Sequence, residues 1–132
     1  IEGAELFYRG EIAAMLAEQS RDGGGHLSRD DLEHYQVQQR TPMLSHYGDT
    51  RLLFNPPPSS GGPLIALSLA LWQQHAAGRP AWGSSAAMTA LAEVMQATNQ
   101  VREQLYDPQI HQPDIAERLL SEPVIGAALR SL

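Results

Sequence analysis

A continuous apolar run from Pro63 to Trp72 constrains the fold of this chain more than any other feature of its sequence. Between Leu64 and Trp72 only Ser68 is strongly polar, so a helix formed by these residues should be buried on nearly all sides. The run is about half of the ~20 residues that a membrane span needs, which predicts a core helix. Proline suits the first position of a helix, so the predicted start is Pro63.

The segment before this run, Pro56-Pro57-Pro58-Ser59-Ser60-Gly61-Gly62, is the most unusual in the chain. Three prolines favour stiff, extended backbone and two glycines permit a sharp turn, which predicts a rigid loop. At a helix start, the hydroxyls of Ser59 and Ser60 and nearby N–H groups could bind an anion. The alternative, which the residues alone favour, is a tight connection in which a serine caps the helix. The chain contains no lysine, which excludes a Walker A loop.

The N-terminal third predicts two helices. Apolar residues at helical spacing predict an amphipathic helix, which Gly10 separates from a short initial turn and Gly23-Gly24-Gly25 ends. These apolar residues are Tyr8, Ile12, Met15 and Leu16. Ser28 and Asp31 have the spacing of a capping box, so a short helix is expected from Ser28 to His34.

A β-hairpin is expected next. The segment from Val37 to Tyr47 is interrupted by Pro42, which prevents a helix, and Tyr47-Gly48-Asp49-Thr50 offers a turn before Leu52 to Phe54. Because Pro42 lacks an N–H donor, its strand is expected at an edge or to be bulged there.

The C-terminal half predicts further helices after a loop from Gly78 to Gly83. Ser84 or Ser85 can cap a long helix that Asp107-Pro108 ends. The predicted buried stripe of this helix is Met88, Leu91, Ala92 and Met95, and a neighbouring stripe is Val94, Val101 and Leu105. Short helices are expected to begin at Pro113 and Pro123.

These elements predict one domain over residues 1–132, mostly α with a small β-hairpin (α+β). The 132 residues, 42% of them hydrophobic, suffice for one modest core. The formal net charge is −6 and the nine basic residues are scattered arginines, which argues against nucleic acid as a partner.

No residue pattern in the chain names a reaction. There is no cysteine, and the five histidines lack a recognisable ligand spacing, so neither a metal site nor a cofactor is expected. We interpret the histidines as isolated residues on the surface. Asp30, Asp31 and Glu33 suit the first turn of a helix, and Arg40 and Arg102 could each bind a carboxylate or pair internally.

Several segments taken in order carry a resemblance to a known family. They are Phe7-Tyr8-Arg9-Gly10 with Ile12-Ala13, Gly24 to Ser28, Asp31-Leu32 with Tyr35, Arg40-Thr41-Pro42 and Pro56 through Gly62. A weaker resemblance continues through Ala87-Met88, Ala92-Glu93, Arg102 and Asp107-Pro108. Together these segments resemble the C-terminal part of the large subunit of γ-glutamyltranspeptidases.

The resemblance implies a helical fragment of an N-terminal-nucleophile hydrolase-type enzyme. In that family a precursor cleaves itself, and the new N-terminal threonine of the small subunit attacks a γ-glutamyl amide, glutathione being the usual donor. The γ-glutamyl group then passes to water or to an amino acid or peptide. The nucleophile and the arginine that grips the glutamyl carboxylate lie outside the matched stretch, so the fragment alone is expected to be inactive and to contain no catalytic residue.

The resemblance assigns Pro58, Ser59, Ser60, Gly61 and Gly62 to support of the active-site half of the parent enzyme. The implied partners are the rest of the large subunit and the small catalytic subunit of the same precursor. Because the apolar helix and the hairpin should pack against these parts, the fragment is expected to expose an apolar patch and to dimerise. A periplasmic or secreted location is suggested by the family alone.

Two departures from the family pattern leave the substrate open. Gln100-Val101 precede Arg102 where Ala-Asp is usual, and Tyr106 replaces the usual glycine before Asp-Pro. A related acylase acting on cephalosporin side chains, or a poly-γ-glutamate hydrolase, therefore stays an alternative. A different alternative is a non-catalytic helical interaction module.

Overall fold

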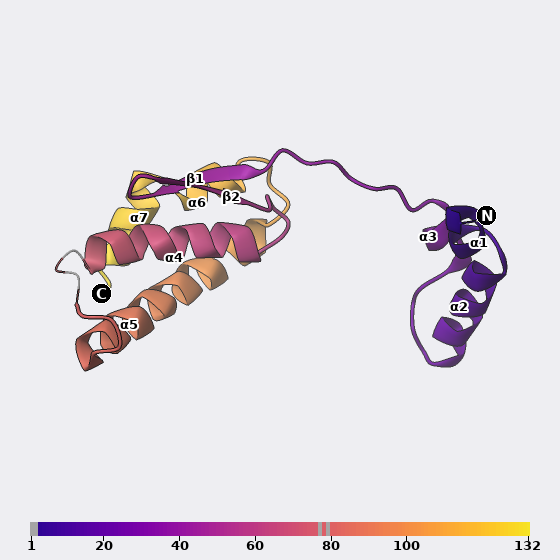
Figure 1. The fold of residues 1–132 in the computed structure, drawn as a ribbon, viewed down its shortest axis with the longest axis horizontal. Helices are drawn as coiled ribbons and strands as arrows, with labels where there is room; N and C mark the ends of the chain where they lie inside the picture. Colours follow the sequence, from indigo (N-terminus) through magenta and orange to yellow (C-terminus); the bar gives the residue numbers. More distant parts are fainter. Residues whose placement is uncertain (1–2, 77, 79) are drawn as a thin grey trace. The chain divides into compact units, whose positions relative to one another are not determined.

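The computed structural model describes residues 3–76, 78 and 80–132. It divides into two compact units, Ile1–Gln39 and Arg40–Leu132, and each is described by itself (Figure 1). The expectation of a single domain over 1–132 stays a prediction. The described elements are helices and a small antiparallel hairpin, as the predicted fold class requires. The predicted loop from Gly78 to Gly83 includes Arg79, which lies outside the described residues.

The first unit consists of α1 (Gly3–Tyr8), α2 (Glu11–Asp22) and α3 (Arg29–Glu33). The predicted break at Gly10 is confirmed, and its cause is a close approach of the backbone. A Cβ at Gly10 would lie 2.8 Å from the carbonyl oxygen of Leu6. The break therefore requires glycine at this position.

Burial within the first unit differs from the predicted stripe. Ala13 and Leu32 are buried, whereas Met15 on α2 is exposed. Met15, which the helical spacing places on the apolar face, is therefore not part of the packed surface, and the buried residue of α2 is Ala13. The rings of Tyr8 and Tyr35 stack with centroids 5.3 Å apart.

The predicted capping box of α3 is confirmed. The Ser28 hydroxyl accepts from the Asp31 N–H at 3.2 Å, and the Asp31 carboxylate accepts from the Ser28 N–H at 2.9 Å. Hydrogen bonds from the Ser28 side chain, and then from its backbone, lower the pKa of Asp31. This end of α3 is thus fixed by its own local sequence.

In the second unit, β1 (Met43–Tyr47) pairs antiparallel with β2 (Thr50–Phe54) and confirms the predicted hairpin. The pairing sets Tyr47 opposite Thr50, and the connecting residue Gly48 has a φ of 53°. Glycine adopts this left-handed conformation without steric cost. The strand begins immediately after Pro42, so Pro42 does not interrupt it as a bulge would.

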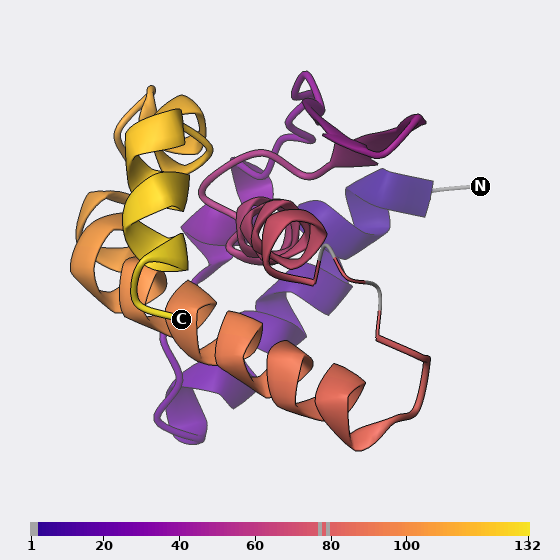
Figure 2. The ribbon, with the colours of Figure 1, turned by 90° about the vertical axis from the view of Figure 1, so that its left-hand side faces the viewer.

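The hairpin leads to α4 (Gly61–His75), the apolar helix, and then to α5 (Ser85–Val101). After α5 come a π-helical turn, η1 (Arg102–Tyr106), and a 3₁₀ turn, η2 (Asp107–Gln109), followed by α6 (Ile115–Leu119) and α7 (Glu122–Leu129). The buried cluster comprises Leu67, Leu71, Val94, Ala97, Tyr106, Ile115, Leu119 and Ala128. Figure 2 shows α4 nearly end-on, with α5 passing beside it and α7 on another side.

Several predicted boundaries of these helices need correction. α4 begins at Gly61, so Pro63 is its third residue, and Ile65 is exposed rather than buried. Asp107-Pro108 does not end the helical path but falls in η2. Pro123 lies at the start of α7 as predicted, whereas Pro113 precedes α6 by two residues.

The buried stripe of α5 is not the predicted one. Its buried residues are Ala87, Val94, Ala97 and Thr98, whereas Met88, Leu91, Ala92 and Met95 are exposed. Small residues allow α4 and α5 to approach, and the hydroxyls of Ser68 and Thr98 meet between them at 2.9 Å. The prediction that Met88 and Met95 fill the core is therefore wrong, and the buried Val94 belongs to the neighbouring stripe.

Candidate functional site

The candidate site is the turn formed by Pro56 to Gly62, which connects β2 to α4. Its two ends are in contact, because the backbone of Asn55 lies directly against Gly62. A Cβ at Gly62 would overlap the Asn55 carbonyl oxygen and lie 2.9 Å from the Cβ of Phe54. Only glycine fits there, so Gly62 closes the base of the turn.

Within the turn, backbone hydrogen bonds fix the path into α4. The Ser59 N–H donates to the Pro56 carbonyl at 3.2 Å, and the Leu64 N–H donates to the Ser60 carbonyl at 3.1 Å. Ser60 immediately precedes α4, but its side chain accepts no capping hydrogen bond from the described residues. The expectation of a serine cap is therefore wrong, and the turn owes its shape to other contacts.

The first of these contacts comes from Tyr106. Its hydroxyl donates to the Ser59 carbonyl at 3.0 Å, across 47 positions of sequence. The Tyr106 side chain is fully buried in the cluster of the second unit. Burial, and then the charge of Asp107, raise the pKa of Tyr106, so the phenol stays protonated and remains a donor.

The second contact comes from Arg40, which donates from Nη1 to the Pro57 carbonyl at 3.3 Å. The structure thus gives Arg40 an internal contact, but with a backbone carbonyl rather than with Asp or Glu. Arg102 also pairs internally, because its Nε donates to both carboxylate oxygens of Asp107 at 3.0 and 3.3 Å. Tyr106 and Arg40 each donate to a carbonyl of the turn from a distant position in the sequence. The sequence alone could not predict these two pairs.

The histidines and carboxylates that the structure describes are dispersed. No group of three or more potential ligands was found among the residues that the structure describes. His75 differs from the expected isolated surface histidine, because its Nε2 lies 2.7 Å from the Glu93 carboxylate and joins α4 to α5. We interpret this pair as structural.

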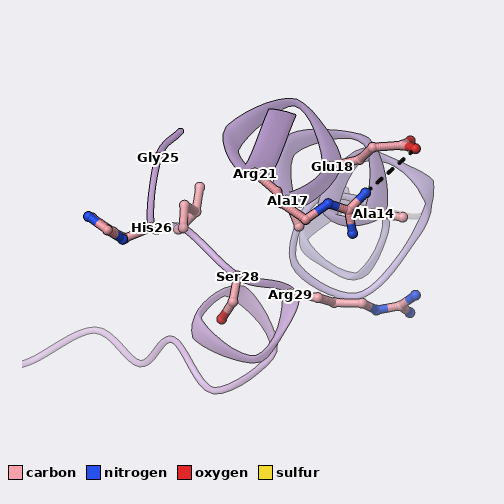
Figure 3. A pocket seen from close by; sticks show the side chains of 9 residues that line it. Ala14, Ala17, Glu18, Arg21, Gly25, His26, Ser28 and Arg29 are labelled. Carbon is pink, nitrogen blue, oxygen red and sulfur yellow. Dashed lines mark ion pairs between the residues drawn. The ribbon is translucent and has the colours of Figure 1, made fainter. Parts of the chain in front are cut away.

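Each unit also has a concave surface that is lined by residues outside the turn. The first, in the unit Ile1–Gln39, has a volume of about 620 Å³ (Figure 3). Its lining residues are Ala14, Ala17, Glu18, Arg21, Gly25, His26, Leu27, Ser28 and Arg29. The arginines already have acidic neighbours, since Arg21 pairs with Glu18 and Arg29 with Glu33. This surface is open, and its lining mixes apolar residues with charged ones.

The second concave surface, in the unit Arg40–Leu132, is an apolar groove of about 520 Å³. The mostly apolar residues that line it are Tyr47, Ser68, Leu69, Trp72, Trp82, Gly83, Ala87, Met88, Leu91, Val94 and Met95. Trp82 is 94% exposed, Met88 60% and Met95 56%. The predicted exposed apolar patch therefore exists, but the long helix α5 supplies much of it.

Among the described helices, none combines the length and apolarity that crossing a membrane requires.

Solved structures share the fold of this chain. γ-Glutamyltranspeptidase from Pseudomonas nitroreducens, complexed with L-DON, matches with a TM-score of 0.78 and 29% identity over 96% of this chain and 38% of that chain. The Helicobacter pylori enzyme matches at a TM-score of 0.79 and 23% identity, covering 98% of this chain and 37% of that chain, which shows the fold. The class defined here is thus the helical part of an N-terminal-nucleophile hydrolase-type enzyme.

The family follows from the sequence profile of Gamma-glutamyltranspeptidase, which matches residues 1–131. This chain belongs to the γ-glutamyltranspeptidase family, and the resemblance stated from its motifs is confirmed. A curated relative, the Glutathione hydrolase proenzyme of Escherichia coli K12, is 34% identical over 91 residues, covering 69% of this chain and 16% of the relative. Acylase ACY 1 proenzyme of Pseudomonas sp. V22 is 32% identical over 94 residues, covering 71% of this chain and 17% of that relative. The chain spans about a sixth of the length of these relatives.

Proposed function

We propose that this chain is a structural part of a γ-glutamyl transferase or hydrolase, and that its turn Pro58 to Gly62 supports the active-site half of the parent enzyme. The observation that carries the proposal is the closure of this turn. Gly62 abuts Asn55 at its base, and Tyr106 and Arg40 bind two of its carbonyls. Contacts from two segments distant in sequence, added to the closure at Asn55, support a turn whose shape serves the site.

In the proposed reaction, an N-terminal threonine supplied by the small subunit attacks the carbonyl carbon of a γ-glutamyl amide. The C–N bond breaks, the amine leaves with a proton, and an ester to the threonine forms. Water or an amino acid or peptide amine then takes the acyl group and releases the threonine hydroxyl. The names of the relatives, glutathione hydrolase and γ-glutamyltranspeptidase, support this donor class.

The isolated chain should not catalyse this reaction. Among the described residues, the recorded hydrogen bonds of serine and threonine hydroxyls run to backbone groups, to Asp31 or to another hydroxyl, and none runs to a histidine. A hydroxyl nucleophile needs a base within hydrogen-bond reach. In this proposal, the base and the nucleophile belong to the small subunit.

The apolar groove indicates the partners of this chain. Trp82, Met88 and Met95 expose large apolar side chains on one unit, which is unfavourable in water. We propose that the rest of the large subunit and the small subunit of the same precursor cover this groove. The isolated chain should then dimerise through this groove, and a strict monomer by sedimentation at high concentration would count against that.

A second candidate is an acylase, which the similarity to Acylase ACY 1 proenzyme favours. γ-Glutamyl and glutaryl amides differ in the α-amino group, so the two activities can be separated with matched donors. The parent enzyme should cleave a γ-glutamyl anilide faster than a glutaryl anilide. The reverse preference would support the acylase.

The experiment uses the full-length precursor. Incubation should yield two subunits on a denaturing gel and release of the chromophore from a γ-glutamyl anilide. The matched control is the precursor with its processing threonine changed to alanine, which should do neither. If the unaltered precursor neither splits nor turns over either donor, the enzyme proposal fails and the interaction module is favoured.

A further inference from the structure

Tyr106 occupies a place in the helix that a regular α-helix would not give it. At roughly 100° per residue, an uninterrupted helix from α5 would put Tyr106 about 120° around the axis from the buried residue Val94. The chain instead adopts the π-helical turn η1 over Arg102–Tyr106. A π-turn accommodates about one extra residue, which turns the following side chains back by roughly 100°. Tyr106 is thereby returned to the buried face.

The consequence is that a phenol hydroxyl, surrounded by apolar side chains, reaches the turn. Tyr106 has no exposed surface, yet its hydroxyl donates to Ser59 at 3.0 Å. A purely apolar residue would satisfy the core equally well without placing a polar atom there. The hydroxyl therefore has a purpose beyond packing, and the residue that it holds belongs to the candidate site.

The hydrogen bond also fixes the orientation of one peptide group. In a trans peptide the C=O and the following N–H point in opposite directions. Because the Ser59 carbonyl faces the Tyr106 hydroxyl, the Ser60 N–H is directed away from it. The peptide that enters α4 thus presents its N–H on the side opposite the core.

We infer that Tyr106 is a positioning residue for γ-glutamyl substrates, which acts by holding the Ser59 carbonyl and so the orientation of the turn before α4. This inference rests on the proposed function of the turn. Arg40 contacts the same turn at a second carbonyl, that of Pro57. The two contacts should therefore be coupled, since each restrains a turn whose base Gly62 already closes.

The test uses the full-length enzyme and the variant Tyr106→Phe, which removes the hydroxyl and keeps the ring in the core. Losing one hydrogen bond to the turn should lower kcat/KM for a γ-glutamyl anilide about three- to tenfold, mainly through KM. The matched control is Tyr35→Phe, an exposed tyrosine of the other unit, which should retain wild-type kcat and KM. Thermal unfolding is measured in parallel.

A merely structural role makes a different prediction. Tyr106→Phe would then lower the unfolding temperature but leave kcat and KM of the folded enzyme within twofold of wild type, which overturns the inference and leaves the proposed function standing. An unaltered enzyme without activity overturns the proposed function, and the inference with it. The variant Arg40→Gln completes a double-mutant cycle. If the double variant loses less kcat/KM than the product of the two single-variant losses, the two residues act through one turn. If the two single-variant losses multiply in the double variant, this coupling is contradicted.

Discussion

The two units of this chain are stabilised in different ways. In Ile1–Gln39, the buried apolar side chains among the described residues are Ala13 and Leu32, and the ordering contacts are mostly local. In Arg40–Leu132, a cluster of mostly large buried side chains joins α4 to residues as distant in sequence as Ala128. A segment of about 40 residues buries too little apolar surface to be stable alone. The first unit therefore depends on caps and turns, and the second on packing.

The largest effect that tests this comparison is expected from Leu67→Ala. Leu67 is fully buried at the centre of the cluster, so its truncation should leave a cavity and lower the free energy of unfolding by about 2–5 kcal/mol. The matched change Leu32→Ala in the first unit should cost less, because few neighbours surround it. Urea unfolding followed by circular dichroism measures both. Equal losses would contradict the contrast between the units.

Gly62→Ala is expected to have the next largest effect. A Cβ at Gly62 would overlap the Asn55 backbone, which cannot move as freely as a side chain, so the turn or β2 must shift. Such overpacking costs about 1–3 kcal/mol. Gly61→Ala is the control, because nothing lies within 4 Å of its added Cβ.

At Gly61 the same substitution should leave the free energy of unfolding unchanged or raise it by up to about 1 kcal/mol, because alanine restricts the unfolded chain. Unfolding temperatures of the two variants should therefore move apart. If both glycines tolerate alanine equally, the turn is not closed at its base.

The sequence predicted features that depend on neighbouring residues better than features that depend on distant ones. The capping box of Ser28 and Asp31, and the turn at Gly48, were predictable because the groups that form them are neighbours in sequence. The Tyr106 hydrogen bond was not, because it depends on a π-turn and on a carbonyl 47 positions away. Composition singled out the loop Pro56 to Gly62 and the family resemblance assigned Pro58 to Gly62 to the site, but which groups hold them could be learned only from the fold.

The methionine stripe of α5 shows a second limit. Met88 and Met95 have helical spacing and an apolar character, so the sequence predicts that they lie in a core. Periodicity identifies an apolar face but not the surface that covers it. Here the small residues Ala97 and Thr98 contact α4, and the methionines line an open groove. We propose that the methionine face is covered by another part of the parent enzyme.

A smaller effect is expected from Ser28→Ala, which removes the side-chain acceptor at the start of α3. Loss of a helix cap costs about 1 kcal/mol, and replacement by threonine should restore most of it. Because the first unit has little core, the loss should be visible as faster amide exchange in α3. If exchange there is unchanged, packing rather than capping orders this unit.

The smallest effect is a pH dependence confined to α3. The hydrogen bonds from Ser28 hold the Asp31 pKa below its ordinary value of 3.8 in the folded chain. A carboxyl with a lowered pKa stabilises the fold above its unfolded value, and this contribution is lost as the pH falls through the folded value. The capping box should therefore open below pH 3.8, while α4 and α5 keep their amide protection. NMR titration of Asp31 tests this, and Ser28→Ala should raise the measured pKa toward 3.8. A pKa unaffected by that substitution would show that the serine does not set the charge state of Asp31.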